Sequence, residues 1–383
     1  MLNTDIPELP TPTLVSEALR RELNIYKQAM PLSRLLGNGM EYTDALAMHA
    51  MADRGIPWAD AGEWLGERNV YRARDAENAG HLLTARSYYR YASACFRFGQ
   101  IALREDTGRK RSIYARLIET FGAAAALNNP PIQKVEIPYR AGKLCGWLML
   151  PPGILAPPVV IVLGGFDGWR EEYFGGACYM VERGMAVLLV DAPGQGETRL
   201  FHHLYLTADV AHAFSCLIDY LLHDSRVGSH AGIWGNSFGG LLATLAASAD
   251  HRIEACCVNG SPARPVESLD RFPPLLAQAG ALIGTTDPDT VRTVLGQLSL
   301  TPETNHIQSA LLQLHGALDP VCSLEAARPI YDEAPGTDKQ IIIWPDGNHC
   351  IYNHSHEKHS IVADWFYDHL CHSSSGTKEQ EGM

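Results

Sequence analysis

The most informative absences from this 383-residue sequence are those of long apolar runs and of a secretion signal. No stretch reaches the 18 or so consecutive apolar residues that a membrane-spanning helix needs, so no such helix is expected. The opening residues, MLNTDIPELPTP, contain acids and prolines and have no apolar centre, unlike a secretory signal. The sequence therefore predicts a cytoplasmic protein that does not bind membranes.

Paired cysteine motifs are also absent. The nine cysteines are an odd number, and no two of them form a C-x-x-C pair. Secreted disulfide frameworks and structural zinc sites both depend on regular cysteine spacing. We therefore expect free thiols in a reducing compartment.

Positive charge is scarce relative to negative charge. Lys and Arg number 31 against 43 Asp and Glu, which gives a net charge of −12 with histidine neutral. A field of this sign disfavours binding to polyanions, so a nucleic-acid partner is not expected. Apolar residues make up 46% and charged residues 19%, which is typical of a globular chain that buries a large core.

The first part of the chain has a helical pattern. Between residues 12 and 127, apolar residues recur three and four positions apart, as in Ala85, Tyr88, Tyr89 and Ala92, and no strand-like run occurs. This pattern predicts a helical N-terminal module over 1–130, with four or five helices.

From residue 132 the pattern changes to short apolar runs separated by helical stretches. Such alternation predicts an α/β domain over 131–372, with a mostly parallel, doubly wound sheet. Residues 259–308 are long for one crossover, so we interpret them as a lid or pocket insertion. Residues 373–383 are expected to be a disordered tail. The expected strands are 132–139, 144–150, 159–163, 186–190, 232–234, 253–258, 310–314 and 340–344, and the expected helices are 170–183, 204–223, 239–248, 323–332 and 358–370.

The strongest chemical signal is the G-x-S-x-G pattern from Gly235 to Gly239, which places Ser237 directly after a strand and before an Ala/Leu-rich helix. A sharp strand-to-helix turn holds such a serine in a strained conformation with its hydroxyl above the sheet. We therefore predict that Ser237 is a nucleophile. The alternative interpretation is an ordinary glycine-rich turn.

A serine nucleophile needs a base, and the expected chain order is Ser, acid, His. Asp319 and His349 each follow a predicted strand, where the pocket of an open parallel sheet forms. His349 is the expected base, and Asp319 is expected to orient it. Two alternatives stay open: Asp319 before a proline could simply cap a helix, and Asp346 is a rival acid in the histidine's own loop.

An oxyanion formed during attack needs hydrogen-bond donors. The backbone N–H of Phe238, which opens the helix after the serine, is one candidate. The loop Gly164–Gly168 supplies the other, with Phe166 N–H as the expected donor beside Gly165 and Asp167. A plain strand–helix turn is the alternative for this loop.

Two further patterns do not predict a cofactor or metal. Residues 191–197 resemble the start of a dinucleotide-binding fingerprint, but Arg199 stands where the third glycine belongs. The histidines of HCIYNHSHEKH, from His349 to His359, do not form H-E-x-x-H, so a polar loop is preferred over a metal site.

Taken together, these residues resemble the α/β-hydrolase superfamily. They are similar to the branch that contains bacterial 2,6-dihydroxypseudooxynicotine hydrolase, fungal polyketide-shortening yellowish-green hydrolases and fermentation-respiration-switch-like esterases. The resemblance covers about residues 40–370 and is carried by GGFDGWREE at 164–172, DAPGQGE at 191–197, GNSFGG at 235–240 and the stretch from His349 to Trp365.

The resemblance implies a Ser-Asp-His hydrolase whose N-terminal helices cap the site, often as a homodimer. Some members of the branch cleave a carbon–carbon bond next to a ketone instead of an ester. We expect a small aromatic or polyketide-like ketone or ester as substrate and no cofactor. The candidate pocket residues are Gly165 and Asp167 in the loop after the first parallel strand, Glu267 in the insertion and Tyr88 in the helical module.

Two other functions remain possible on the sequence alone. The same three residues could transfer an acyl group to a hydroxyl or promote cyclisation. A non-catalytic scaffold is the alternative from another class, although Ser237, Asp319 and His349 are all present.

Overall fold

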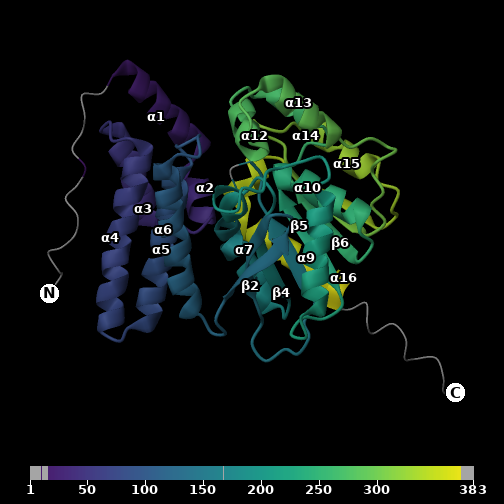
Figure 1. The fold of residues 1–383 in the computed structure, drawn as a ribbon, viewed down its shortest axis with the longest axis horizontal. Helices are drawn as coiled ribbons and strands as arrows, with labels where there is room; N and C mark the ends of the chain where they lie inside the picture. Colours follow the sequence, from purple (N-terminus) through teal and green to yellow (C-terminus); the bar gives the residue numbers. More distant parts are fainter. Residues whose placement is uncertain (1–9, 11–15, 167, 372–383) are drawn as a thin grey trace. The chain divides into compact units, whose positions relative to one another are not determined.

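A computed structural model describes residue 10, residues 16–166 and residues 168–371 of the chain (Figure 1). The chain divides into two compact units, one ending at Lys134 and the other beginning at Val135. The sequence pattern places this boundary a few residues earlier, at the Pro130-Pro131 pair.

The described part of the N-terminal unit is helical and contains six helices, one or two more than the sequence pattern predicts. The difference arises because the first two helices are separated by a break of two residues that ends in Pro31, and the second helix is only six residues long. The helices are α1 (Glu17–Ala29), α2 (Leu32–Gly37), α3 (Tyr42–Asp53), α4 (Trp58–Asn78), α5 (Leu82–Gln100) and α6 (Gly108–Ala126).

Helices α4 and α5 pack closely in this unit. A Cβ atom added to Gly62 of α4 would lie 2.5 Å from the Cα atom of Gly99 on α5, so the two backbones meet where neither residue has a side chain. Trp58 lies nearby in the helical core, and its indole N–H donates to the carbonyl of Phe98 at 3.0 Å. Close backbone approach therefore sets the distance between these two helices.

The second unit contains an eight-stranded sheet in the order β1-β2-β4-β3-β5-β6-β7-β8. Strands β4, β3, β5, β6, β7 and β8 pair in parallel, and β2 pairs antiparallel with β4. This is the mostly parallel sheet that the sequence predicts. The strands are β1 (Gln133–Tyr139), β2 (Gly142–Met149), β3 (Val159–Leu163), β4 (Ala186–Asp191), β5 (Ala231–Asn236), β6 (Ile253–Asn259), β7 (Ala310–Gly316) and β8 (Lys339–Trp344).

Side chains that alternate along β5 contact helices on both faces of the sheet. Ile233 belongs to the apolar core with α9 (Ala211–His223) and α10 (Phe238–Ala249). A side chain at Gly232 would instead meet Phe366, and the ring of Trp234 contacts His359 at 5.8 Å between centroids. Both of these partners belong to α16 (Ser355–Cys371), which packs beside α7 (Phe174–Glu182). Burial on both faces explains why the central strands are apolar without interruption.

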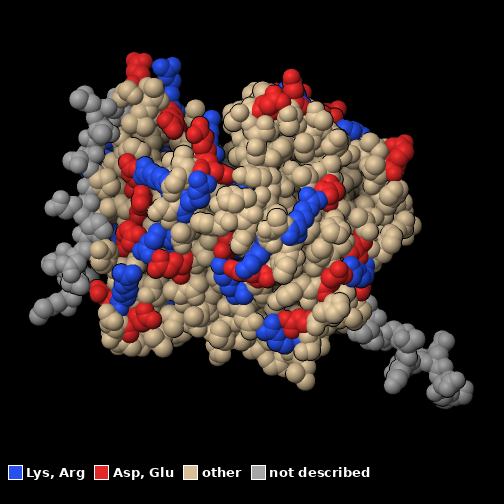
Figure 2. Space-filling view, viewed as in Figure 1, with Lys and Arg blue, Asp and Glu red and all other residues tan. Residues whose placement is uncertain are grey.

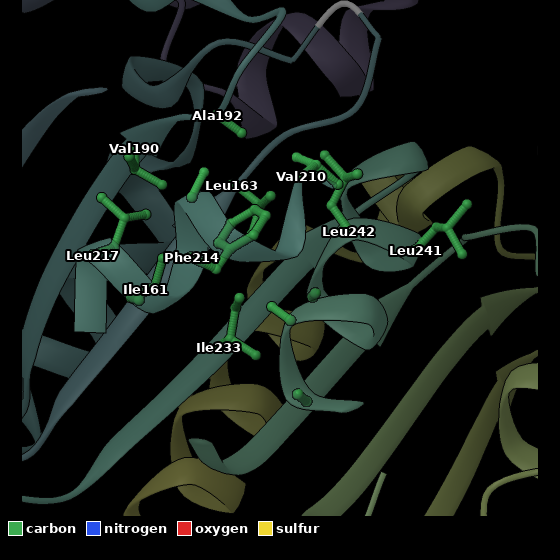
Figure 3. Close-up of a cluster of buried hydrophobic side chains, with 14 of the residues drawn as sticks. Ile161, Leu163, Val190, Ala192, Val210, Phe214, Leu217, Ile233, Leu241 and Leu242 are labelled. Carbon is green, nitrogen blue, oxygen red and sulfur yellow. The ribbon is translucent and has the colours of Figure 1, made fainter. Parts of the chain in front are cut away.

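The core between the sheet and α9 and α10 is built mainly from aliphatic side chains, and Phe214 is the aromatic residue labelled among them in Figure 3. These side chains are fully or nearly fully buried, so they fix α10 and the start of its first turn against the strands. The residues labelled in Figure 3 are Ile161, Leu163, Val190, Ala192, Val210, Phe214, Leu217, Ile233, Leu241 and Leu242.

Parallel pairing aligns the carboxyl ends of five strands. Gly235 of β5 pairs with Leu163 of β3, and Asn236 pairs with Asn259 of β6. The last residue of β7, Gly316, pairs with Trp344, the last residue of β8. The loops that follow these strands consequently start from one edge of the sheet.

Three predicted helices need correction. The segment 204–223 is helical only from Ala211, and a short helix α8 (Gly196–Leu200) precedes it. The segment 323–332 forms two short helices, α14 (Leu324–Ala327) and α15 (Pro329–Asp332), with a proline at the start of the second. The last helix begins at Ser355, before the predicted residue 358.

The proposed lid, residues 259–308, contains three helices, α11 (Pro265–Arg271), α12 (Leu275–Ile283) and α13 (Pro288–Gln297). Leu269, Leu282 and Leu295, one from each helix, are buried in the main apolar core of the second unit. The remaining helical segments are the short 3-10 turns η1 (Arg170–Tyr173) and η2 (His349–His354). Within the described residues, no helix is long and apolar enough to cross a membrane.

The surface carries charges of both signs. On the face seen in Figure 2, acidic and basic side chains are interspersed and form no broad area of a single sign.

We predict that Gly62→Ala destabilises the N-terminal unit. The new methyl group would force α4 and α5 apart, and overpacking of this kind costs about 1–3 kcal/mol. The measurement is urea or thermal unfolding. Gly108→Ala is the matched control, because a Cβ at the first residue of α6 meets nothing within 4 Å. Equal stability of the two variants would contradict the close approach of these helices.

Candidate active site

Ser237 lies in a strained turn between β5 and α10. Its backbone angles are φ 55° and ψ −135°, a region that non-glycine residues rarely occupy. Its N–H donates to the carbonyl of Asn259 at 2.8 Å, which fastens the turn to the end of β6. Ser237 is partly exposed, whereas its chain neighbours Asn236 and Phe238 are buried. The turn therefore leaves the serine partly accessible while the residues on both sides of it are buried, as the G-x-S-x-G pattern predicts.

Ser237, His349 and Asp319 form a continuous chain of hydrogen bonds. The Nε2 atom of His349 lies 3.0 Å from Oγ of Ser237, and its Nδ1 atom lies 2.8 Å from Oδ2 of Asp319. Because a carboxylate accepts, Nδ1 carries the proton and Nε2 is left to accept the proton of the serine hydroxyl. This geometry suits proton transfer away from the serine.

Asp319 is held as a carboxylate by its surroundings. Its side chain is 1% exposed, and Oδ1 accepts the N–H groups of Val321 at 2.8 Å and Cys322 at 2.9 Å. Burial opposes ionisation, but His349 and the two amides outweigh it and lower the pKa of Asp319. Asp319 does not cap the helix that follows, because Ser323 is the N-cap of α14. One oxygen of Asp319 instead holds its own turn, and the other oxygen contacts the histidine.

The rival acid, Asp346, faces another histidine. Its Oδ1 atom lies 2.9 Å from Nε2 of His354, and its side chain is 68% exposed. Geometry therefore favours Asp319 as the partner of His349.

Asp319 also controls the protonation of His349. The side chain of His349 is 19% exposed. Burial by itself would disfavour the charged imidazole, but the carboxylate of Asp319 prevails and raises the pKa of His349 well above its ordinary value. The pair consequently favours the imidazolium that forms whenever Ser237 gives up its proton.

The loop that carries His349 is strained. Cys350 and Ile351, which follow it, both have left-handed backbones, with φ of 55° and 56°. Such a conformation costs about 1–2 kcal/mol for each non-glycine residue, and a β-branched residue is least suited to it. Side-chain hydrogen bonds hold the loop: Tyr352 N–H donates to Oδ1 of Asn348 at 2.8 Å, and the carbonyl of Cys350 accepts from both Asn259 and Lys358.

The two predicted oxyanion donors belong to adjacent segments. Phe238 is the first residue of α10, where N–H groups have no partner within the helix. A Cβ atom on Gly165 would lie 2.7 Å from Cβ of Ser237 and 3.0 Å from N of Phe238, so only glycine allows this approach. The rings of Phe166 and Phe238 stack with centroids 4.4 Å apart. Both segments thus meet beside the serine.

Gln195 fixes the Gly165 segment from behind. The side-chain amide nitrogen of Gln195, Nε2, donates to the carbonyls of Gly164 and Gly165, the latter at 2.9 Å. Its Oε1 accepts the N–H of Ala192 at 3.0 Å. The segment 191–197, which only resembles the start of a dinucleotide-binding fingerprint, therefore supports the loop that contains Phe166.

A buried ionic network holds the segment 191–197 in place. Arg170 is fully buried and forms ion pairs with Glu171 at 2.8 Å, with Asp191 at 3.5 Å and with Glu197. The backbone N–H groups of Arg170 and Glu197 both donate to the carboxylate of Asp191. The WREE and DAPGQGE segments are thus joined to each other through charge pairs.

One group of side chains in the described part of the chain could supply three metal ligands. Cys145, Glu197 and His202 each place a ligand atom within 4.8 Å of the others. The carboxylate of Glu197 is already ion-paired with Arg170, so this group is not a ready-made cation site.

The pocket predictions have separate outcomes. Asp167 lies outside the described residues. Glu267 is an exposed residue in the first turn of α11, and its charge and that of Arg271 act on the thiol of Cys322 beside Asp319. Tyr88 lies on α5 in the N-terminal unit, where it lines a cavity of about 510 Å³ within that unit and its ring contacts Tyr91. A pocket role for Glu267 or Tyr88 stays a prediction.

Comparison with known proteins agrees with the fold. Residues 172–373, more than half of the chain, match the model of the prolyl oligopeptidase family. The chain belongs to this family. It is a hydrolase with the α/β-hydrolase fold, as the sequence resemblance implies.

Individual relatives include both bacterial and fungal hydrolases. The chain is 27% identical to 2,6-dihydropseudooxynicotine hydrolase of Paenarthrobacter nicotinovorans over 88% of its own length and 91% of that protein. It is 33% identical to the alpha/beta hydrolase ucsC of Acremonium sp over 51% of its length, but it spans only 46% of that fungal protein. The crystal structure of 2,6-dihydroxy-pseudo-oxynicotine hydrolase matches with a TM-score of 0.81 and 25% identity, covering 92% of this chain and 98% of the other.

Sequence reasoning did not single out three of the residues that hold the site together. Gln195 lies in the segment 191–197, which the sequence marks as glycine-rich, but no local signal shows that its side-chain amide binds another loop. Asn259 ends an apolar strand, and its polarity at that position was the one available signal. Lys358 looks like an ordinary surface lysine among the histidines of HCIYNHSHEKH, although it is 2% exposed.

We predict that Asp319→Asn lowers the pKa of His349. Loss of the carboxylate leaves burial as the dominant influence, which disfavours the charged imidazole. In the wild type, the stabilisation from this pair is fully present below the ordinary histidine pKa and is lost as pH rises through the raised one. The measurement is an NMR titration of ¹³C-labelled histidine, with His349→Gln used to assign the signal.

The matched control for this titration is Asp346→Asn. It removes the rival carboxylate, which contacts His354. A shift of the His349 signal in Asp346→Asn but not in Asp319→Asn would reverse the assignment of the acid.

Proposed function

We propose that this chain is a serine hydrolase in which Ser237 is the nucleophile, His349 the general base and Asp319 the residue that orients and stabilises the base. The observation that carries the proposal is the uninterrupted hydrogen-bond chain, 3.0 Å and 2.8 Å long in its two links, that starts at a partly exposed serine. Strain at Ser237 and at the His349 loop accords with a site held in shape for reaction.

In the proposed reaction, Oγ of Ser237 attacks the substrate's carbonyl carbon while Nε2 of His349 takes the hydroxyl proton. The negative charge that develops on the carbonyl oxygen is placed near the N–H groups of Phe238 and Phe166. Each such donor is worth about 2.7–4 kcal/mol in the transition state. His349 then returns the proton to the leaving group, and water hydrolyses the acyl-enzyme by the same steps.

The leaving group defines the two versions of the reaction. In ester cleavage it is an alkoxide, which His349 protonates to an alcohol. In cleavage of a β-diketone-type bond it is a carbanion stabilised as an enolate, which His349 protonates to a ketone. We propose a small aromatic or polyketide-like ketone or ester as the substrate, and the similarity to a hydrolase of 2,6-dihydropseudooxynicotine over most of both chains supports this class.

The helical N-terminal unit is proposed to act as a cap that contributes to the substrate pocket, and the whole protein is proposed to be a homodimer. Half-buried aromatic residues on its helices, including Tyr88, supply suitable apolar surface. Trp58 and Tyr89 are poor candidates for substrate contact, because Trp58 is buried in the helical core and Tyr89 donates its hydroxyl to Glu77 at 2.7 Å.

We predict that a fluorophosphonate adds once to the wild type and not at all to Ser237→Ala, as recorded by intact mass. Turnover of p-nitrophenyl butyrate should fall on the order of 10⁶-fold in Ser237→Ala, as in other serine-triad enzymes. The control is Ser261→Ala, which changes a buried serine two residues past the end of β6. An adduct that persists in Ser237→Ala would place the nucleophile elsewhere, and no adduct on the wild type would favour the non-catalytic alternative.

We predict that the wild type cleaves aryl β-diketones as well as aryl esters, with His349→Ala inactive toward both. The products formed in ¹⁸O-labelled water, measured by mass spectrometry, distinguish the reactions. One labelled oxygen in the released acid indicates hydrolysis, whereas an unlabelled ester or lactone product indicates acyl transfer or cyclisation. Cleavage of esters alone would remove the carbon–carbon version of the proposal.

A further inference from the structure

The carbonyl oxygen of Cys350 accepts hydrogen bonds from two side chains that belong to different elements. Lys358 of α16 donates from Nζ at 2.9 Å, and Asn259 at the end of β6 donates from Nδ2 at 3.1 Å. Cys350 directly follows His349 in the chain, so both donors act on the residue next to the proposed base. The proposed reaction steps do not use either side chain.

Asn259 connects the histidine loop to the serine turn. Its Nδ2 group also donates to Oδ1 of Asn236 at 2.9 Å, and its carbonyl accepts the N–H of Ser237 at 2.8 Å. The thiol of Cys350 in turn lies 3.8 Å from that carbonyl oxygen. One residue at a strand end therefore contacts the segments that carry the nucleophile and the base.

Lys358 is an unusual residue for this position, because it is 2% exposed. Burial lowers its pKa to about 8, while Glu172 and the thiols of Cys350 and Cys257 favour its charged form, and His359 lies beside it in the helix. An apolar side chain of similar length would avoid the burial of an ammonium group. The hydrogen bond to the Cys350 carbonyl is what the lysine offers and such a side chain does not.

We propose that Lys358 and Asn259 form a clamp on the carbonyl of Cys350 that positions His349 for proton exchange with Ser237. The inference rests on the proposed serine mechanism and deepens it. Cys350 and Ile351 have strained left-handed backbones. Removing the two donors would therefore let the loop move toward a less strained conformation. Relaxation would displace the imidazole from its 3.0 Å contact with the serine. A displacement of about 1 Å at a reacting group can slow a reaction about 100-fold. Both clamp residues are positioning residues, since neither contacts the reacting atoms.

A purely structural role predicts a different outcome. If Lys358 served only to stabilise the fold, its replacement would reduce stability and activity together. If it serves to position His349, Lys358→Met should keep or raise the melting temperature, because it removes a buried charge, and should still slow the reaction.

The test compares Lys358→Met with Lys339→Met in the full-length protein. Lys339, at the amino end of β8, also donates from Nζ to backbone carbonyls, those of Tyr331 and Ala334, but it lies at the opposite end of the strand from the His349 loop. Each variant is assayed for kcat and KM with p-nitrophenyl butyrate, for the rate of fluorophosphonate inactivation and for melting temperature.

We expect Lys358→Met to lower kcat and the inactivation rate by about 10- to 100-fold with little change in KM. Lys339→Met should leave these rates unchanged. Lys358→Arg keeps a cationic donor and should recover part of the lost rate. Asn259→Ala should also lower kcat, and the double variant should lose less than the product of the two single effects, because both donors act on one oxygen.

Each remaining outcome separates this inference from the proposed function. A wild type that no fluorophosphonate labels removes the serine mechanism itself. A labelled wild type with unchanged rates in Lys358→Met overturns the clamp and leaves the mechanism intact. A melting temperature that falls in Lys358→Met, with no recovery of rate in Lys358→Arg, assigns the lysine to fold stability instead. Independent effects of Asn259→Ala and Lys358→Met would overturn their joint action on Cys350.

Discussion

The in-register hydrogen bonding of the parallel strands is the constraint on which the candidate site depends. Asn236, Asn259 and Leu314 lie next to one another because β5, β6 and β7 pair in parallel with matched ends. The serine, acid and histidine belong to loops that leave this edge, although 112 residues separate Ser237 from His349. A shift of one strand by a single residue would turn its side chains to the other face and move its loop away from the others.

Hydrogen bonds at this edge of the sheet hold the loops of the candidate site in place. Ser237 is fastened to Asn259, the Gly165 segment to Gln195, and Asp319 to the amides that follow it. These contacts oppose the strain in the left-handed turns, which the chain would otherwise relax. The buried ion pairs of Arg170 act one step further away, because they fix the turn that contains Gln195. The candidate catalytic residues are thus held in place by groups that the proposed reaction does not use.

Much of the fold and site could be predicted from the sequence because the signals are local. Apolar runs of strand length locate the strands, since a strand covered on both faces has no polar positions to interrupt it. The G-x-S-x-G pattern locates Ser237, since the turn it describes is made by neighbouring residues. The chain order of acid and histidine after their own strands then selects Asp319 and His349 from many carboxylates and sixteen histidines. Helix boundaries were less predictable: residues 204–210 have helical composition but lie outside α9, which begins at Ala211.

The sequence by itself determined the fold class, the positions of most strands and the residue types available for chemistry, because each depends on patterns within a few positions. Tertiary structure decided the rest. It separated Asp319 from Asp346 by placing one carboxylate against the histidine and leaving the other at the surface. It also buried Lys358 and directed Asn259 toward the Cys350 carbonyl, contacts that join residues 8 and 91 positions apart. No local pattern records such pairings, because the partners become neighbours only when the sheet assembles and brings its loops together.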